Sequence, residues 1–456
     1  MRYTTTISLL LILIPLSAAL GEDRDLTSTE KSLERLERAL EQDQTLAPET
    51  RESLRELVGA LRAERAARAA DHRDAAGEVT KGDIARAVDE YLAVRSPPEE
   101  RSVWEEVLDR LALYGDLRLR YEAAFHLDNE SDRHRLRLRF RLGANYQLLD
   151  DVLVGARLVT GNPEDPRSSH QTLGNAFDSF EISLDRAFVT YQPGWLDSAA
   201  VFTGGKFQHP FSSNPVYQEL VWDADIQPEG AVAGYSLSDL WLLDSLDFRA
   251  GAYVLLEQGN GDDTFLFPFQ VAAQFRVVEN VTGNIAAGYY FYTNVDTSPL
   301  VSENRGNVTV DTDGDGRPDD YASEFGIVNP ILAFTYTGGQ FPVTVSGEYI
   351  LNTEASIAED QGWAVGVSAG STRKRGDWRL YYQWQVLEQD SVFSPVTQDD
   401  FLLATNFRGH VFGGNYQILD KIGLHLWALV SQLDTRSPGA SHRDEWRVRA
   451  DLNVRF

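Results

Sequence analysis

Residues 444–456 read DEWRVRADLNVRF, and this last stretch of the chain decides the fold class. Apolar and polar side chains alternate along it; the apolar set is Trp446, Val448, Ala450, Leu452, Val454 and Phe456, and the polar set is Arg447, Arg449, Asp451, Asn453 and Arg455. A period of two residues predicts a β-strand with one apolar face. The charged opposite face excludes a dry sandwich core and suits a strand that lies between lipid and water.

Two earlier stretches repeat this pattern with arginine at almost every polar position. Leu117, Leu119 and Tyr121 alternate with Arg118, Arg120 and Glu122, and Leu136, Leu138, Phe140 and Leu142 alternate with Arg135, Arg137, Arg139 and Arg141. A whole face of arginine can line a water-filled lumen while the apolar face meets lipid.

The alternation continues to the end of the chain and predicts sixteen strands. Besides 117–122 and 135–142, the segments lie near 151–160, 180–191, 200–207, 229–237, 247–257, 266–278, 281–292, 328–337, 341–351, 361–371, 376–388, 403–416, 421–433 and 444–456. Residues 113–456 are therefore expected to form an all-β, 16-stranded antiparallel transmembrane barrel.

The connections between these segments alternate in length. The long ones are 126–132, 162–179, 208–228, 258–265, 293–327, 352–360, 389–402 and 434–443, whereas most of the others hold only two or three residues. Short turns at one end and long loops at the other are typical of a transmembrane barrel. Two short-side gaps, 192–199 and 237–246, are longer than this rule predicts.

The first 112 residues have a different character. Residues 1–21, with Arg2 before an apolar run and small residues after it, are expected to be a secretory signal peptide. Residues 22–112 are expected to be a helical periplasmic segment, with leucine seams of about two heptads at Leu33, Leu36, Leu40 and at Leu54, Leu57, Leu61. This segment is either a short coiled coil or a loosely packed helical plug or spacer.

The amino-acid composition excludes several classes of protein for this chain. The chain has 456 residues, 42 Lys and Arg against 69 Asp and Glu, a formal net charge of −27, no cysteine and one methionine. The acidic balance argues against a nucleic-acid partner. The lack of cysteine excludes disulfide frameworks and thiolate metal sites.

Five segments together resemble the putative porin family of Gram-negative envelopes. They are YGDLRLRYE (114–122), RHRLRLRFRLG (133–143), LDRAFVTYQP (184–193), GGKFQHPF (204–211) and VWDADIQPEGAVAGY (221–235). The resemblance implies a 16-stranded, homotrimeric outer-membrane porin that contacts lipid and lipopolysaccharide. Phe456, which ends the last strand, is similar to the signal that the barrel assembly machinery reads.

The predicted pore site consists of a loop inside the barrel and the arginine-bearing face of the strands opposite it. In porins of this size the third outer loop, here 208–228, commonly folds into the barrel. Its carboxylates would face basic side chains across a constriction; the candidate lining residues are Arg118, Arg120, Arg135, Arg137, Arg139, Arg141, Lys206, Glu219, Asp223 and Asp225. Arg186 shares parity with the apolar Ile182 and Leu184, so only a β-bulge would turn it inward. Alternatively, the arginines pair with acidic neighbours and hold the loop, and the cation or anion preference is left open.

A metal motif lies in the fifth outer loop, where residues 311–320 read DTDGDGRPDD. Asp311, Asp313, Asp315 and Asp319 follow the spacing of a calcium loop, but its twelfth position is Ala322 and not glutamate, which excludes a complete EF-hand. A structural calcium ion is expected here, with a solvated acidic loop as the alternative.

No catalytic motif or histidine pair with ligand spacing is present, so no enzyme activity is expected. The sequence favours a channel for passive diffusion of small hydrophilic solutes or ions. The alternative is a structural outer-membrane protein that tethers the envelope through its N-terminal helices, by contact with peptidoglycan.

Overall fold

The computed structural model describes residues 107–126 and 132–456, apart from 164, 178, 219, 260–261, 296–298, 402 and 436–443, together with Gly59. The chain divides into two units, Met1–Glu100 and Arg101–Phe456. The predicted signal peptide (1–21) and almost all of the predicted helical periplasmic segment (22–112) lie outside the described residues. β1 begins at Leu111, so the barrel starts two residues before the predicted position 113.

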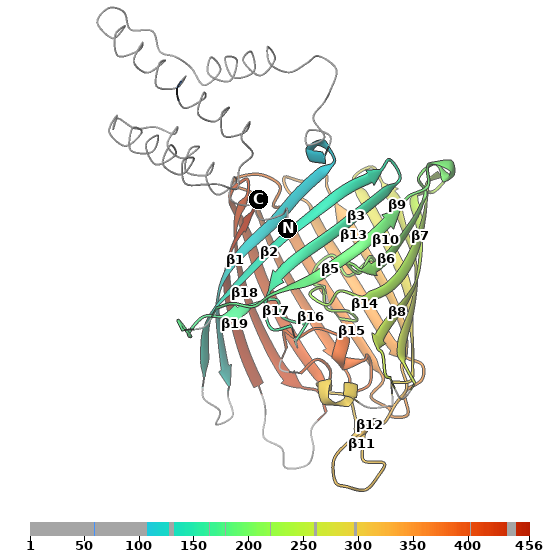
Figure 1. The fold of residues 1–456 in the computed structure, drawn as a ribbon, viewed down its shortest axis with the longest axis vertical. Helices are drawn as coiled ribbons and strands as arrows, with labels where there is room; N and C mark the ends of the chain where they lie inside the picture. The colour runs from blue at the N-terminus through green and yellow to red at the C-terminus, as the bar shows by residue number, and fades with distance from the viewer. Residues whose placement is uncertain are drawn as a thin grey trace, which may run out of the picture. The chain divides into compact units, whose positions relative to one another are not determined.

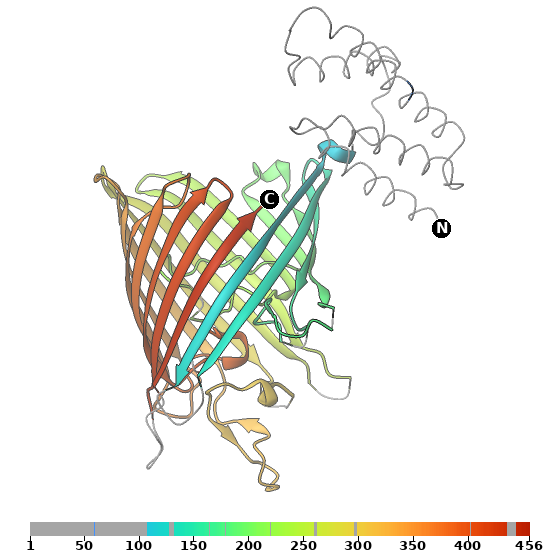
Figure 2. The same cartoon turned by 90° about the vertical axis from the view of Figure 1, so that its left-hand side faces the viewer.

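Sixteen long antiparallel strands form one closed barrel in the described part of the chain (Figures 1 and 2). They are β1 (Leu111–His126), β2 (Arg133–Leu149), β3 (Val152–Thr160), β5 (Ile182–Tyr191), β6 (Ala200–Lys206), β7 (Glu229–Leu240), β8 (Leu243–Leu256), β9 (Thr264–Val278), β10 (Val281–Thr293), β13 (Gly326–Tyr336), β14 (Val343–Asn352), β15 (Gln361–Gly370), β16 (Trp378–Leu387), β17 (Phe407–Leu419), β18 (Ile422–Leu433) and β19 (Asp444–Arg455). The predicted count and order of the strands are confirmed.

Three short strands and three 3-10 turns complete the described elements. β4 (Gln171–Thr172) pairs with β2, and β11 (Thr309–Val310) pairs with β12 (Asp320–Tyr321) in a hairpin of the loop between β10 and β13. The turns are η1 (Gly194–Leu196), η2 (Pro299–Glu303) and η3 (Ser394–Val396). No described helix is both long enough and apolar enough to cross a bilayer.

The first and last strands close the barrel. β1 pairs with β19 from Asp116 opposite Arg455 to His126 opposite Glu445. Gly115 and Phe456 then exchange two backbone hydrogen bonds of 3.1 Å. The ring of Phe456 lies over Gly115, which has no side chain to block it, and stacks at 6.1 Å from Phe140. The last residue is therefore part of the seam.

Side chains sort to two faces as the alternation predicts. Leu119, Leu136 and Leu142 are exposed on the outer face, where a bilayer would cover them, whereas Arg120 and Arg139 are buried inside. Burial of these guanidinium groups requires charged or polar partners within the barrel.

Two short turns show how local sequence sets the register. The tripeptide Asn-Tyr-Gln precedes both the β2–β3 turn and the β17–β18 turn. In each, the glutamine, Gln147 or Gln417, donates its side-chain amide to carbonyls of the turn, and the strand register shifts at the same point.

The gap between β7 and β8 is shorter than the alternation predicts. Both strands extend until Leu240 pairs with Leu243, which leaves a two-residue turn in place of the predicted gap 237–246. Trp241 in that turn has a φ of 42°, and Asp239 before it has a φ of 56°. These left-handed residues make the tight turn that the apolar pattern does not reveal.

The interior of the barrel is filled unevenly. Apolar side chains from the loops after β6, β10 and β16 pack against inward-facing residues of strands β8 to β18. At one point the ring of Phe393 lies 5.1 Å from Tyr292, 5.2 Å from Phe325 and 5.3 Å from Tyr321. A polar cavity lies against β1, β2, β3, β5 and β19, and side chains of β16 to β18 also reach it.

Candidate functional site

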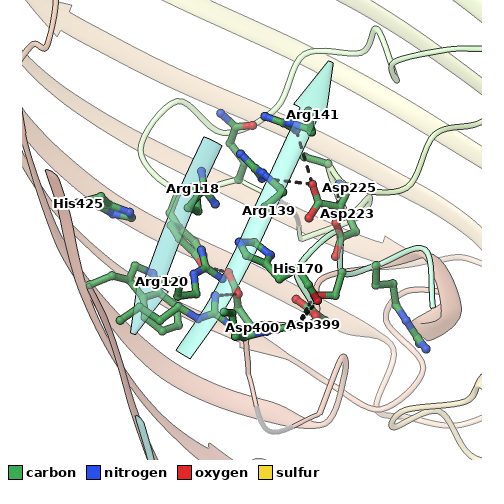
Figure 3. A pocket seen from close by; sticks show the side chains of 18 of the residues that line it. Arg118, Arg120, Arg139, Arg141, His170, Asp223, Asp225, Asp399, Asp400 and His425 are labelled. Atoms are coloured by element: carbon green, nitrogen blue, oxygen red, sulfur yellow. Dashed lines mark hydrogen bonds and ion pairs between the residues drawn. The ribbon is translucent and has the colours of Figure 1, made fainter. Parts of the chain in front are cut away.

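A cavity of about 520 Å³ lies inside the barrel against the arginine-bearing strands (Figure 3). Its wall combines side chains of strands and of three loops. The lining residues are Arg118, Arg120, Arg137, Arg139, Arg141, Arg157, Arg167, Ser168, His170, Arg186, Gln208, Val216, Tyr217, Gln218, Asp223, Ala224, Asp225, Arg379, Tyr381, Asp399, Asp400, Asn415, His425, Trp427 and Arg449.

The loop at 207–228, between β6 and β7, runs through the barrel interior from one wall to another. At its ends, Arg186 of β5 donates to Gln227 (2.7 Å) and Gln208 (3.1 Å). At its middle, Arg379 of β16 donates to the carbonyl oxygens of Pro215 (2.9 Å) and Val216 (3.0 Å). The loop is therefore held at both sides by guanidinium groups that bond to neutral oxygens.

Arg186 reaches the interior because β5 contains a bulge. Arg157 lies opposite Arg186 and Leu158 lies opposite Leu184, so Asp185 is the extra residue in the β3–β5 ladder. The shift turns Arg186 to the lumen although Ile182 and Leu184 face outward, as an inward orientation requires. Asp185 pairs with Arg157, with a shortest distance of 2.5 Å.

The wall arginines share a small number of carboxylates. Asp451 accepts two hydrogen bonds from Arg120, at 2.8 and 2.9 Å, and lies 3.8 Å from Arg118. Asp116 accepts from Arg139 (2.9 Å) and from Arg141 (2.7 Å). In each case one carboxylate is shared by two guanidinium groups, so it offsets only half of their positive charge.

Glu122 lies in a similar position between three arginines. It accepts from Arg135 and from Arg449 (2.5 Å), and it lies 3.9 Å from Arg137. Its side chain is 1 % exposed, so these guanidinium groups replace water as its partners.

Carboxylates of the 207–228 loop face this wall. Asp225 lies 3.8 Å from Arg139 and 4.0 Å from Arg141, and it accepts from Ser169 at 3.0 Å. Burial alone would raise the pKa of Asp225, but the neighbouring arginines hold it below its usual range. Asp223 bonds to the backbone N–H of Asp225 at 2.7 Å and lines the same cavity.

Two loops that were not predicted to line the site also reach the cavity. Asp399 and Asp400 come from the loop between β16 and β17, and Asp400 accepts from both Tyr217 and Arg449. Arg167 and His170 come from the loop between β3 and β5. An adjacent pair of acids in loop 389–402 was the available signal in the sequence, but nothing local to it indicates that this loop turns inward.

The predicted site residues divide into three groups. Arg118, Arg120, Arg137, Arg139, Arg141, Asp223 and Asp225 line the cavity together. Arg135 and Lys206 are not among its lining residues, because Arg135 turns to Glu122 and Lys206 pairs with Glu229 at 2.5 Å. Glu219 lies outside the described residues.

The predicted calcium ligands also divide. Carboxylate oxygens of Asp311, Asp313 and Asp315 lie within 4.8 Å of one another. Asp319 turns instead to Thr312, accepting from its N–H and its hydroxyl at 2.8 Å each. The calcium site stays a prediction, with Asp319 outside the cluster of three.

The fold is similar to those of three solved structures. OprB of Pseudomonas putida at high pH superposes with a TM-score of 0.53 at 13% identity, covering 77% of this chain and 96% of that chain. OmpF of Salmonella typhi in complex with daunomycin gives a TM-score of 0.47 at 12% identity, covering 76% and 97%. The trimer form of OmpT of Vibrio cholerae gives 0.43 at 11% identity, covering 76% and 99%. At these identities only the likeness to OprB carries weight, and it concerns the fold alone.

No curated protein matches the sequence. The family model described as "Putative porin" matches residues 124–325 and 334–456, which is well over half of the chain. Together with the closed barrel, this match points to the outer membrane and to a channel rather than an enzyme. The chain belongs to the putative porin family.

Proposed function

We propose that this protein is an outer-membrane channel for passive diffusion of small hydrophilic solutes or ions. The observation that carries the proposal is a polar cavity lined by guanidinium groups inside a closed 16-stranded barrel. A barrel of this size leaves an aqueous interior unless loops fill it. Here apolar loop residues pack against strands β8 to β18, and the polar cavity lies on the arginine side.

The constriction of this channel lies between the 207–228 loop and the arginine wall. Asp223 and Asp225 would form one side, and Arg139 and Arg141 the other. Asp225 lies 3.8 and 4.0 Å from these arginines, which supports a constriction whose edge carries charges of both signs in contact with one another. Charges of both signs beside a narrow passage orient dipolar solutes and select among ions.

Planar-bilayer recording of the purified full-length protein tests this function. Discrete conductance steps are expected, and Arg137→Ala combined with Arg139→Ala should change both the conductance and the reversal potential in a salt gradient. Arg408→Ala is the control, because Arg408 is half-exposed on β17 and pairs with Asp434 at 2.6 Å, away from the cavity. An unchanged double variant would exclude this wall from the constriction, and a silent membrane would exclude the channel.

The assembly and the placement in the envelope follow from the family resemblance. We expect a homotrimer in the outer membrane, in contact with lipid and lipopolysaccharide, assembled through the strand that ends at Phe456, with its N-terminal segment in the periplasm. Whether residues 22–110 occlude the mouth or tether the barrel to peptidoglycan is tested by recording with and without them. A tether that is plugged would show no current until these residues are removed.

Calcium binding by the fifth outer loop is a separate proposal. The cluster of Asp311, Asp313 and Asp315 supports it, because converging carboxylates repel one another unless a cation balances them. Calorimetric titration of the protein with calcium should show binding that Asp313→Asn weakens. Asp319→Asn is the matched control, since Asp319 turns to Thr312, and absence of binding at millimolar calcium would remove the site.

A further inference from the structure

The cavity wall presents guanidinium groups whose charge is only partly neutralised. Arg118 donates to the neutral amide oxygen of Asn453 at 2.7 Å. The carboxylate nearest to it in the structure, Asp451 at 3.8 Å, already accepts both bonds of Arg120. Arg118 therefore contributes positive charge to the cavity without a hydrogen-bonded anion among the described residues.

Arg137 is the second such group. Its Nη2 donates to the hydroxyl of Ser168 (2.8 Å) and to the carbonyl oxygen of His170 (3.2 Å). Glu122 lies 3.9 Å away and is occupied by Arg135 and Arg449. Arg137 is only 8 % exposed, yet its Nε has no hydrogen-bond partner in the described part of the protein. An unsatisfied buried guanidinium N–H costs free energy that an anionic ligand would recover.

His170 gives an independent indication of a ligand. Its ring lines the cavity at 7 % exposure, and its Nε2 also lacks a partner among the described residues. Figure 3 places this ring beside Arg139 and Arg120 at the centre of the cluster. Burial, and then the positive charges of Arg120, Arg139, Arg118 and Arg137, hold the pKa of His170 well below its usual range. The ring is therefore neutral and can present an N–H to an oxygen atom.

The carboxylates that share the cavity make their closest contacts with other groups, although the charge of Asp225 also acts on Arg118. Asp225 faces Arg139 and Arg141, and Asp400 accepts from Arg449 and Tyr217. These acids bond to other partners, so the region of Arg118, Arg137 and His170 carries positive charge without a hydrogen-bonded carboxylate among the described residues.

We propose that this part of the cavity is a binding site for multivalent oxyanions, namely inorganic phosphate or small dicarboxylates, which the channel concentrates as they pass. The inference rests on the proposed channel function and deepens it by naming the class of solute. Guanidinium groups match the paired oxygens of carboxylate and phosphate, whereas chloride offers no such geometry. A cavity of about 520 Å³ has room for such an ion with part of its hydration shell.

Two measurements on the full-length protein test the site. In planar bilayers, phosphate or succinate added to a potassium chloride solution should block the chloride current in a saturable manner. In detergent, calorimetry should detect binding of the same two anions to the protein without any need for conduction. Phosphate alone binding, succinate alone binding, or both, would each support the site and identify the class that it prefers.

Variants then locate the site. Arg118→Gln, Arg137→Gln and His170→Ala should each raise the half-blocking concentration by about tenfold, since each removes a charged or polar group that bonds the anion. Arg408→Gln is the matched control, because it removes an equal charge from β17 outside the cavity.

The outcomes separate the two proposals. Conductance without saturable block or measurable binding would overturn the oxyanion site and leave the channel intact. Binding without conductance would overturn the channel and leave the site. If the control weakens block as much as Arg137→Gln does, the effect is one of overall charge and the site is wrong.

Discussion

At the scale of single residues, strand register decides which charges meet. Arg120 lies opposite Asp451 across the β1–β19 seam, and Glu122 lies between Arg449 on one side and Arg135 on the other. The alternation in the sequence places these side chains on the inner face but does not give the register. Arg135 was predicted to line the pore from the alternation alone; in the structure it bonds to Glu122 and is not among the residues that line this cavity.

The seam glycine gives a prediction at this scale. In Gly115→Ala, the added Cβ would overlap the ring of Phe456 and lie 2.5 Å from the carbonyl oxygen of Arg141. The backbone oxygen cannot move away without breaking hydrogen bonds between the strands, so we expect the free energy of unfolding to fall by about 1–3 kcal/mol. The measurement is the temperature at which the folded, fast-migrating band converts to the unfolded band on a gel.

The matched control for that variant is Gly234→Ala in β7. Its Cβ would meet no atom closer than 3.8 Å, so the conversion temperature should change little. Equal shifts in the two variants would mean that the close approach at the seam is unimportant for stability.

At the scale of elements, the strands could be predicted from the sequence, but the packing of the loops could not. A period of two is a local property, and lipid on one face enforces it along each strand. The contact of Tyr217 with Asp400 joins residues 183 positions apart, so neither loop alone indicates it. The bulge at Asp185 could be predicted only in part. The parity of Arg186 in the sequence indicates that a bulge is needed to turn it inward, but it does not show that the bulge is present.

The interior loop core provides the prediction at this scale. Phe393 is 1 % exposed and packs on three aromatic rings, so Phe393→Ala should cost about 3–5 kcal/mol. Because this core holds the loops after β10 and β16, the variant should also show larger and noisier single-channel currents. The measurements are thermal conversion on gels and bilayer recording.

A phenylalanine of the loop between β3 and β5 serves as the control. Phe177 is 97 % exposed, so Phe177→Ala removes the same side chain without opening a cavity. Wild-type currents in Phe393→Ala would show that the loop core does not control the passage.

At the scale of the whole molecule, net charge and local charge have opposite signs. The chain carries a formal charge of −27, whereas the cavity is lined by ten arginines and four aspartates. Exposed acids act through water and salt, which screen them over about 10 Å at 0.1 M ionic strength. Charges in the cavity act on a solute directly, so ion preference should follow the wall and not the isoelectric point.

Acidification should therefore strengthen the preference for anions. Burial, and then the neighbouring charge of Asp400, raises the pKa of Asp399 to about 6. A carboxyl with that pKa is almost fully ionised at pH 7.5 and only about one-tenth ionised at pH 5. Lowering the pH thus removes close to one negative charge from the cavity, and the reversal potential in a salt gradient should move toward the anion limit, with its midpoint near pH 6.

In Asp399→Asn the reversal potential at pH 7.5 should already equal the value that the wild type reaches at acidic pH, and it should change less with pH. If the variant keeps the full pH dependence of the wild type, other groups cause the change, and Asp399 does not control the charge that a passing ion meets.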